Sequence, residues 1–106
     1  MRGPYRLEMI RVDMTIPSGV GGVYCLAHNT DTVEYVDRTD RGLRDALKSH
    51  VSEYQYYWYD LGLSSRETYV CHCEAYHKHA GSLGIGKNEH PKPPPALDVK
   101  CPVCGQ

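Results

Sequence analysis

The sequence predicts an α+β fold: a small, mainly antiparallel sheet of about three strands flanked by helices, with a cysteine-containing C-terminal tail. Three observations lead to this prediction. Two short apolar runs lie on either side of a polar turn, the apolar spacing changes to a helical period after residue 40, and a proline-rich stretch follows the last predicted helix. A chain of 106 residues has room for one such domain.

The first part of the chain is predicted to be extended. Residues 5–16 alternate roughly between apolar and charged side chains, which favours a strand, and residues 1–20 form an N-terminal extended segment. The run GVYCLAH begins at Gly22, and the run VEYVD begins at Val33 after a polar turn. Two strands joined by such a turn predict a β-hairpin.

Two helices and a further strand are predicted after the hairpin. Residues 41–53 place apolar residues at helical spacing along one face, whereas the next run, YQYYWYDLGL, is aromatic and prone to form a strand. Ser64 and Glu67 form a capping box that opens a second helix through about Ala80. Prolines between residues 91 and 95 then exclude a helix and favour an extended tail.

Composition and charge exclude several classes of protein. Lys and Arg number 12 against 13 Asp and Glu, which argues against a basic protein that coats nucleic acid and against an acidic solubilising tail. No apolar run approaches the ~20 residues that span a bilayer. The N-terminal stretch lacks the apolar segment of a secretory signal, so we expect an intracellular, cytoplasmic protein.

An ordered set of residues carries a resemblance to a known family. Gly22-Val23-Tyr24 on one predicted strand and Tyr35-Val36-Asp37 on the next resemble the paired signature of the GIY-YIG endonuclease domain. A helix that ends in Lys48-Ser49-His50, then Glu74 in a later helix, then Asn88 shortly before His90-Pro91, follow in a similar order. The resemblance covers about residues 21–95, which we take as a GIY-YIG-like domain, with residues 96–106 as a tail that packs on it.

The resemblance implies a nuclease that cleaves phosphodiester bonds in nucleic acid, with DNA favoured over RNA, by means of one divalent metal ion. It implies that Glu74 binds Mg²⁺ or Mn²⁺, and that Tyr24, Tyr35 and a helix arginine act on the nucleophile and the phosphate. Asn88 would brace the site, and His50 is a plausible general base. We therefore expect Tyr24, Tyr35, His50 and Glu74 to converge on one concave face.

Two positions depart from the family's pattern. Asp37 stands where the family has a glycine, and Ala46 stands where the helix arginine is expected. Arg38, Arg41 and Arg44 are then the candidates to contact phosphate, although Arg44 lies about 200° from Ala46 around a helix. Three functions stay open: a metal-dependent nuclease, a catalytically impaired nucleic-acid or protein binding module on the same fold, and a mainly structural zinc protein whose tyrosines pack.

The cysteines predict a separate zinc site. Cys101 and Cys104, in the run Cys-Pro-Val-Cys-Gly, are typical of half a zinc knuckle because the tight turn aims two thiolates at one point. Cys73 and His77 share a helix face at spacing i, i+4 and would complete a structural site that fastens the tail to this helix. An extended segment would pair Cys71 with Cys73 instead. The weaker candidates are His72 and His79.

Overall fold

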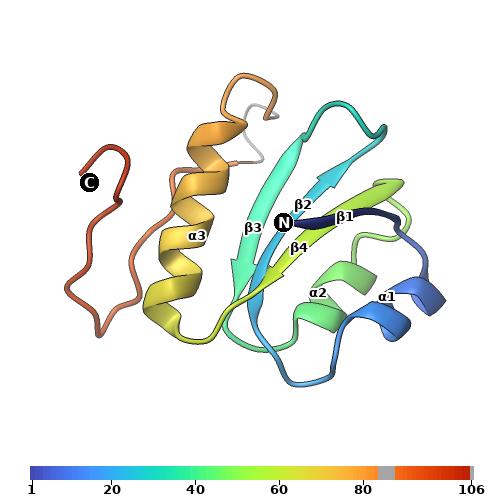
Figure 1. Ribbon diagram of the computed structural model, residues 1–106, viewed down its shortest axis with the longest axis horizontal. Coiled ribbons are helices and arrows are strands. Elements are labelled where there is room, and N and C mark those ends of the chain that lie inside the picture. Colours follow the sequence, from blue (N-terminus) through green and yellow to red (C-terminus); the bar gives the residue numbers. More distant parts are fainter. Residues whose placement is uncertain (84–87, 106) are drawn as a thin grey trace.

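The computed structural model describes residues 1–83 and 88–105. Within these residues the protein has a four-stranded antiparallel sheet and three helices, so the predicted α+β fold is confirmed (Figure 1). The strands lie in the order β1-β4-β2-β3. Their bounds are Arg2–Arg6 for β1, Gly22–Ala27 for β2, Tyr35–Thr39 for β3 and Tyr56–Leu61 for β4. The helices are α1 (Met9–Thr15), α2 (Leu43–Lys48) and α3 (Ser65–Lys78).

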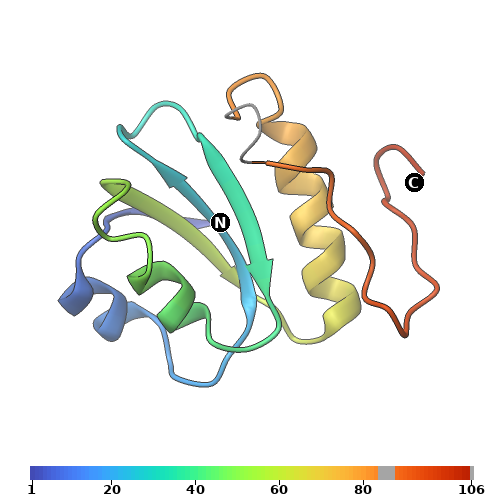
Figure 2. The same ribbon diagram turned by 180° about the vertical axis from the view of Figure 1, so that it is seen from behind.

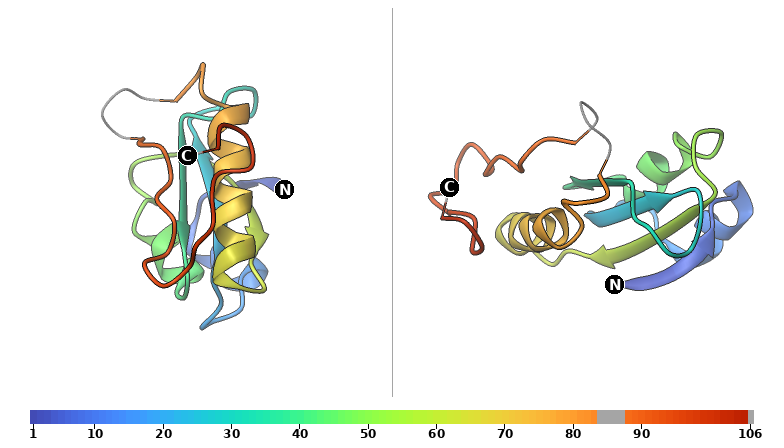
Figure 3. Two further views of the ribbon diagram at one scale, coloured as in Figure 1. Left: turned by 90° about the vertical axis from the view of Figure 1, so that its left-hand side faces the viewer. Right: turned by 90° about the horizontal axis from the view of Figure 1, so that it is seen from above.

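The helices cover the two faces of the sheet unequally. Helices α1 and α2 lie on one face, where Leu43 and Leu47 pack with Tyr24 and Leu26 of β2 (Figure 2). Helix α3 lies along β3 and β2 on the other face, where its Ala75 belongs to the second core cluster. Seen from above, no described helix covers β1 and β4 on the α3 side (Figure 3). Part of one sheet face is therefore open.

The N-terminal segment differs from the extended segment that the alternation predicts. A strand forms only as far as Arg6, and α1 follows. The physical reason lies in which apolar residues are buried. Val12 and Ile16 are 0% and 1% exposed and four residues apart, which is helical spacing, whereas Ile10 is 71% exposed. The apparent alternation counted exposed apolar side chains as if they were buried.

No described helix is long and apolar enough to cross a membrane.

The predicted hairpin, later strand and second helix form. Strands β2 and β3 pair antiparallel with Tyr24 opposite Asp37, and β4 pairs with the other side of β2. Helix α3 begins after Ser64, whose hydroxyl accepts a hydrogen bond from the Glu67 backbone N–H at 3.1 Å, as the capping box predicts. Helix α2 is shorter than residues 41–53, because hydrogen-bonded turns replace it after Lys48.

Glycine is required at the start of β2 because neighbouring backbone approaches closely. A Cβ atom on Gly22 would overlap the backbone carbonyl oxygen of Asp60 in β4. A Cβ atom on Gly21 would overlap the backbone of Thr39 and Asp40 at the end of β3. These two glycines therefore allow β2 to lie between its partners at the spacing of a sheet.

The C-terminal tail runs beside α3 and is joined to the edge of the sheet by Asn88 (Figure 2). The Val36 backbone N–H donates to Asn88 Oδ1 at 2.9 Å, and Asn88 Nδ2 donates to the Glu34 carbonyl oxygen at 3.1 Å. The described tail residues, 88–105, contain no helix or strand, as the prolines predict.

Replacing Asn88 tests this attachment. We expect Asn88→Ala to lower the free energy of unfolding by about 1–2 kcal/mol, because the Val36 N–H and the Glu34 carbonyl both lose a partner. Amide hydrogen exchange at Val36 should become faster. Asn29→Ala is the matched control, since the Asn29 side chain also bonds two backbone groups but lies in the turn between β2 and β3. Unchanged exchange at Val36 in Asn88→Ala would contradict the prediction.

Candidate functional site

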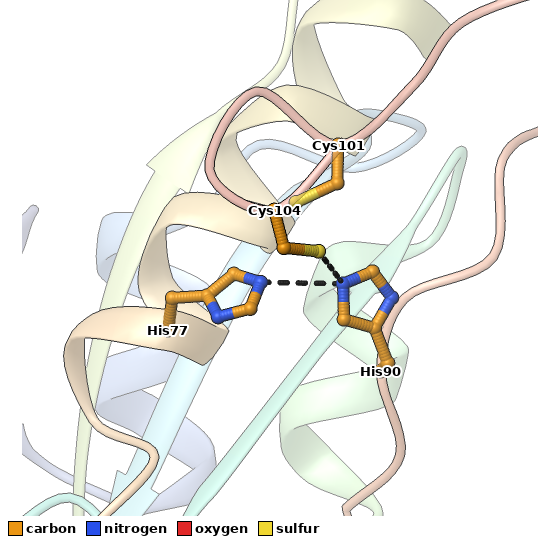
Figure 4. Close-up of side chains that lie close together, drawn as sticks. All are labelled: His77, His90, Cys101 and Cys104. Carbon is orange, nitrogen blue, oxygen red and sulfur yellow. Dashed lines mark hydrogen bonds between the residues drawn. The ribbon is translucent and has the colours of Figure 1, made fainter. Parts of the chain in front are cut away.

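Four side chains gather where the tail meets the end of α3. His77, His90, Cys101 and Cys104 place their ligand atoms within 4.8 Å of one another (Figure 4). The Nε2 atoms of the two histidines are 3.2 Å apart, and His90 Nε2 lies 3.1 Å from Cys104 Sγ. Two nitrogen and two sulfur atoms form a donor set that structural zinc takes in tetrahedral sites. This cluster, the tail metal centre, could therefore bind a metal ion such as zinc.

Local structure orients these ligands. His77 lies in the last turn of α3, so the helix holds its backbone. His90 Nδ1 lies 2.9 Å from the Pro91 carbonyl oxygen. Because a carbonyl only accepts, Nδ1 carries the proton of the neutral ring, and the lone pair lies on the Nε2 atom that faces the cluster. The Gly105 backbone N–H donates to the Cys101 carbonyl at 2.9 Å and closes the turn between the two cysteines.

The environment of Cys101 favours the thiolate. Burial acts to raise the pKa of this thiol, but hydrogen bonds from the backbone N–H groups of Cys104 and Val103 and from neighbouring thiols outweigh burial and lower it to about 5. Thiolate is the form of cysteine that binds metal ions. The knuckle turn thus prepares one ligand before any ion arrives.

The cluster differs by one residue from the zinc site that the sequence predicts. His77, Cys101 and Cys104 belong to it, but His90 takes the place expected for Cys73. Cys73 is 0% exposed and packs with Tyr69 and Cys101 in a small core cluster, so it lies beside one ligand but outside the convergent group. The sequence signal for His90 was its position: it is one of two histidines, with His79, between α3 and the terminal cysteines, and it begins the proline-rich stretch.

The other proposed zinc ligands lie elsewhere. Cys71 Sγ donates towards Asp60 Oδ2 at 3.7 Å, on the side of α3 that faces the sheet. It does not join Cys73, because side chains two residues apart on a helix point in different directions. His72 Nδ1 accepts a hydrogen bond from Arg38 Nη1 at 2.8 Å. His79 is the C-cap residue that follows α3. None of these three side chains belongs to the tail metal centre.

A second group of side chains, the aromatic cluster, lies on the α2 face of the sheet and contains Tyr24, Tyr35, His50 and Tyr54. Ring centroids of Tyr24 and Tyr35 are 6.3 Å apart, and those of Tyr35 and His50 are 5.3 Å apart. The Tyr24 hydroxyl lies 3.5 Å from His50 Nε2. Three of the four residues expected to converge are thus brought together, two of them on neighbouring strands.

The phenols of Tyr24 and Tyr35 in the aromatic cluster are held protonated at neutral pH. Burial, followed by the Asp37 carboxylate, raises the pKa of Tyr24 above its ordinary range and the pKa of Tyr35 to about 12. The Tyr35 hydroxyl donates to Asp37 Oδ2 at 3.2 Å, and His50 Nδ1 lies 2.9 Å from Glu53 Oε2. A phenol with a raised pKa is a poor general base.

Glu74 is not part of the aromatic cluster, and the expectation that it converges with the tyrosines is wrong. It lines a pocket on the α3 side of the sheet together with Cys25 and Trp58. Side chains alternate along a strand, so Cys25 and Tyr24 point to opposite faces of β2. The sheet therefore separates Glu74 from Tyr24. Because Ala75 packs into the core cluster of this second face, α3 carries Glu74 with it.

A catalytic Mg²⁺ or Mn²⁺, which the resemblance implies, does not fit the aromatic cluster. Over residues 1–83 and 88–105, the one group of three or more His, Cys, Asp or Glu side chains with converging ligand atoms is the tail metal centre. Asp37 and Glu53 each bond to a side chain of the aromatic cluster itself. A hard cation needs several oxygen ligands, and the geometry does not collect them here.

Two of the three arginine candidates, Arg38 and Arg44, form hydrogen bonds within the fold. Arg38 lies on the α3 side of β3, where it donates to His72, so it cannot face Tyr24. Arg44 Nε donates to the Ile16 carbonyl oxygen at 2.8 Å. Arg41 is exposed in the loop between β3 and α2. Asn88 braces the β3 edge, as described above, because its side-chain amide bonds backbone atoms of Val36 and Glu34.

The buried His72 gives a prediction about pH. Burial, followed by the positive charge of Arg38, lowers the pKa of His72 from 6.5 to about 4. In the unfolded chain this imidazole takes up a proton below about pH 6.5, whereas in the folded protein it stays neutral until about pH 4. The unfolded state therefore binds more protons in this window, and stability falls as the pH falls through it.

We expect His72→Gln to reduce the loss of melting temperature between about pH 7 and about pH 5, although its melting temperature at neutral pH can be lower. Circular dichroism melts at both pH values measure the difference. His28→Gln is the control, because His28 is exposed at the end of β2. The same loss of melting temperature in the wild type and in His72→Gln would show that another group controls the pH dependence.

Compared with known proteins, the chain matches no family model, no curated protein and no solved structure. The fold and the site define the class: an α+β protein with a candidate His₂Cys₂ metal centre that joins its tail to α3.

Proposed function

We propose that this protein is a zinc-stabilised binding module in which Zn²⁺ at His77, His90, Cys101 and Cys104 fastens the C-terminal tail to α3. The observation that carries the proposal is that ligand atoms from three separate segments lie within 4.8 Å of one another. Four protein ligands would fill a tetrahedral zinc site and leave no position for a reactive water, which is the arrangement of structural rather than catalytic zinc.

Besides the Asn88 bonds, the described contacts of the tail are few: Arg38 Nη2 donates to the Lys92 carbonyl oxygen, and Cys101 packs with Tyr69 and Cys73. Of the residues after 88, Pro91 and Cys101 are buried, and most of the others are exposed or half-buried. Structural zinc contributes on the order of 10 kcal/mol to small zinc-binding peptides, far more than the hydrogen bonds of one asparagine. The prolines restrict the unfolded tail and so reduce the entropy lost when it docks.

The placement of charged groups favours binding over phosphodiester hydrolysis. Phosphoryl transfer needs a metal ion and a cation that face the developing negative charge. Here Glu74 and Arg38 lie across the sheet from Tyr24, and Arg44 is bound to backbone. A metal-dependent nuclease is the second candidate, and the meeting of Tyr24, Tyr35 and His50 is the observation that favours it.

The same charges favour a protein or small-molecule ligand over nucleic acid. Arg44 and Lys48 both pair with Asp13, at 3.7 Å and 2.5 Å. Affinity for nucleic acid comes largely from Lys and Arg side chains that displace counterions from phosphates. Basic side chains that already pair with an acidic neighbour contribute little to this effect.

Two measurements on the purified full chain test the proposal. Elemental analysis should find about one zinc ion per chain. Incubation with Mg²⁺ or Mn²⁺ and plasmid, single-stranded DNA or RNA should give no cleavage beyond that of Glu74→Ala. Absence of zinc would refute the metal centre. Cleavage that is lost in both Glu74→Ala and Tyr24→Phe would establish the nuclease instead.

A further inference from the structure

A pocket of about 470 Å³ opens between α3 and the uncovered part of the sheet. It lies on the face opposite the aromatic cluster, and it is distinct from the tail metal centre. Trp58 of β4 and Cys25 of β2 line it from the sheet, and Cys71 and Glu74 line it from α3. Its volume is within the range of pockets that bind small molecules. The proposed binding module therefore has a site that the zinc ion does not occupy.

We propose that this pocket binds an organic cation, an alkylammonium or guanidinium group, that stacks on Trp58 and pairs with Glu74. The inference deepens the proposed binding function and rests on it, because it names the class of ligand. It makes no use of the metal ion.

The charges that line the pocket support a cation. Three carboxylates, those of Asp31, Asp60 and Glu74, are accompanied by two positive groups, Lys78 and the Met1 amino group. The pocket therefore carries an excess of negative charge.

The carboxylates of Glu74 and Asp60 differ in whether another charged group already engages them. Among the described residues no ion pair engages Glu74, although Lys78 is one turn away on α3. Asp60 Oδ2 lies 3.8 Å from the amino group of Met1, so an ammonium group already sits beside this oxygen. Glu74 is therefore the carboxylate with which a ligand can pair.

The aromatic wall supplies the second part of the recognition. Tryptophan is the strongest of the aromatic side chains in binding a cation over its ring face. Trp58 is half-buried and lines the pocket. The same face of β4 already shows this interaction, because the Arg6 guanidinium lies 5.6 Å from the centre of the Tyr56 ring.

The thiols of the pocket point to reversible rather than covalent binding. Burial, followed by nearby acidic groups, raises the pKa of Cys25 to about 12 and the pKa of Cys71 to about 11. Both thiols are therefore protonated at neutral pH and are weak nucleophiles. They line the pocket as small apolar groups beside the tryptophan.

Because Trp58 is the only tryptophan in the sequence, its fluorescence reports directly on the pocket. We would titrate the zinc-loaded full chain with tetramethylammonium, with butylguanidinium and with the neutral isostere butylurea. A second arm uses a short neutral peptide with one central arginine and the same peptide with citrulline in its place. We expect saturable changes with the cations and with the arginine peptide, and no change with butylurea or the citrulline peptide.

Variants locate the binding. Glu74→Gln should weaken cation binding about fivefold or more, because a charge-assisted contact is lost. Glu8→Gln, an exposed carboxylate at the start of α1, should leave the affinity unchanged. Binding of the free cations supports a small-molecule ligand, and binding of the arginine peptide alone supports a protein ligand in the same pocket.

Equal binding of butylguanidinium and butylurea, or equal affinity in the wild type and Glu74→Gln, would overturn the inference. The zinc content of the same samples separates it from the proposed function. Zinc-loaded protein that binds no cation rejects the pocket and keeps the metal centre, whereas cation binding by protein that lacks zinc rejects the metal centre and keeps the pocket.

Discussion

His90→Ala is expected to abolish tight zinc binding and to release the C-terminal tail. Because a structural zinc ion contributes on the order of 10 kcal/mol in small zinc-binding peptides, the expected loss is several kcal/mol of unfolding free energy. The wild type should show a lower melting temperature in the presence of a zinc chelator, and His90→Ala should show the same low melting temperature with and without chelator. Thermal melts and zinc analysis of both proteins measure these effects.

Two further variants sharpen this test. His79→Ala is the matched control, since His79 lies two residues after His77 but outside the tail metal centre. It should keep its zinc and its sensitivity to chelator. Cys73→Ala distinguishes the two ligand sets. If Cys73→Ala loses zinc while His90→Ala retains it, the set predicted from the sequence is correct and the one seen in the structure is not.

Gly22→Val is expected to have the second large effect. A side chain at this position would overlap the Asp60 carbonyl oxygen and would also contact Leu43. Backbone cannot move away without breaking the pairing of β2 with β4, so we expect a loss of about 3 kcal/mol or more. Urea unfolding measures this loss.

Gly81→Ala is the control for Gly22→Val. Among the residues that the structure describes, none comes within 4 Å of a Cβ atom at Gly81, so this variant should stay within about 0.5 kcal/mol of the wild type. A Gly22→Val protein with wild-type stability would show that the two strands are further apart than the structure places them.

Local patterns in the sequence predicted the elements whose burial is regular. The hairpin of β2 and β3 was predictable because a polar turn separates two apolar runs, and the start of α3 was predictable because Ser64 caps it directly. Helix α1 was not, since Ile10 and Met14 are apolar but exposed. Strand β1 was obscured by Pro4, which a strand tolerates at a sheet edge.

The candidate sites were predictable only in part for a different reason. The spacing of His77, Cys101 and Cys104 is local information, and these three residues do converge. His90 comes from an irregular tail that has no periodicity to reveal which way its side chain points. Glu74 lies on the sheet face opposite the aromatic cluster. The sequence could not predict this, because helical spacing shows which side of α3 is buried but not which face of the sheet the helix covers.

The contact of Asn88 with β3 also bears on whether copies of the protein can join edge to edge. A free edge strand offers unpaired N–H and carbonyl groups to which a strand of another molecule can add, as in amyloid. At the β3 edge, one amide side chain occupies the Val36 N–H and the Glu34 carbonyl, as a neighbouring strand would. At the opposite edge, β1 carries Pro4, which has no N–H, between two charged arginines. Both edges of the sheet are thereby protected, so the addition of a strand from another molecule is disfavoured while the tail stays in place.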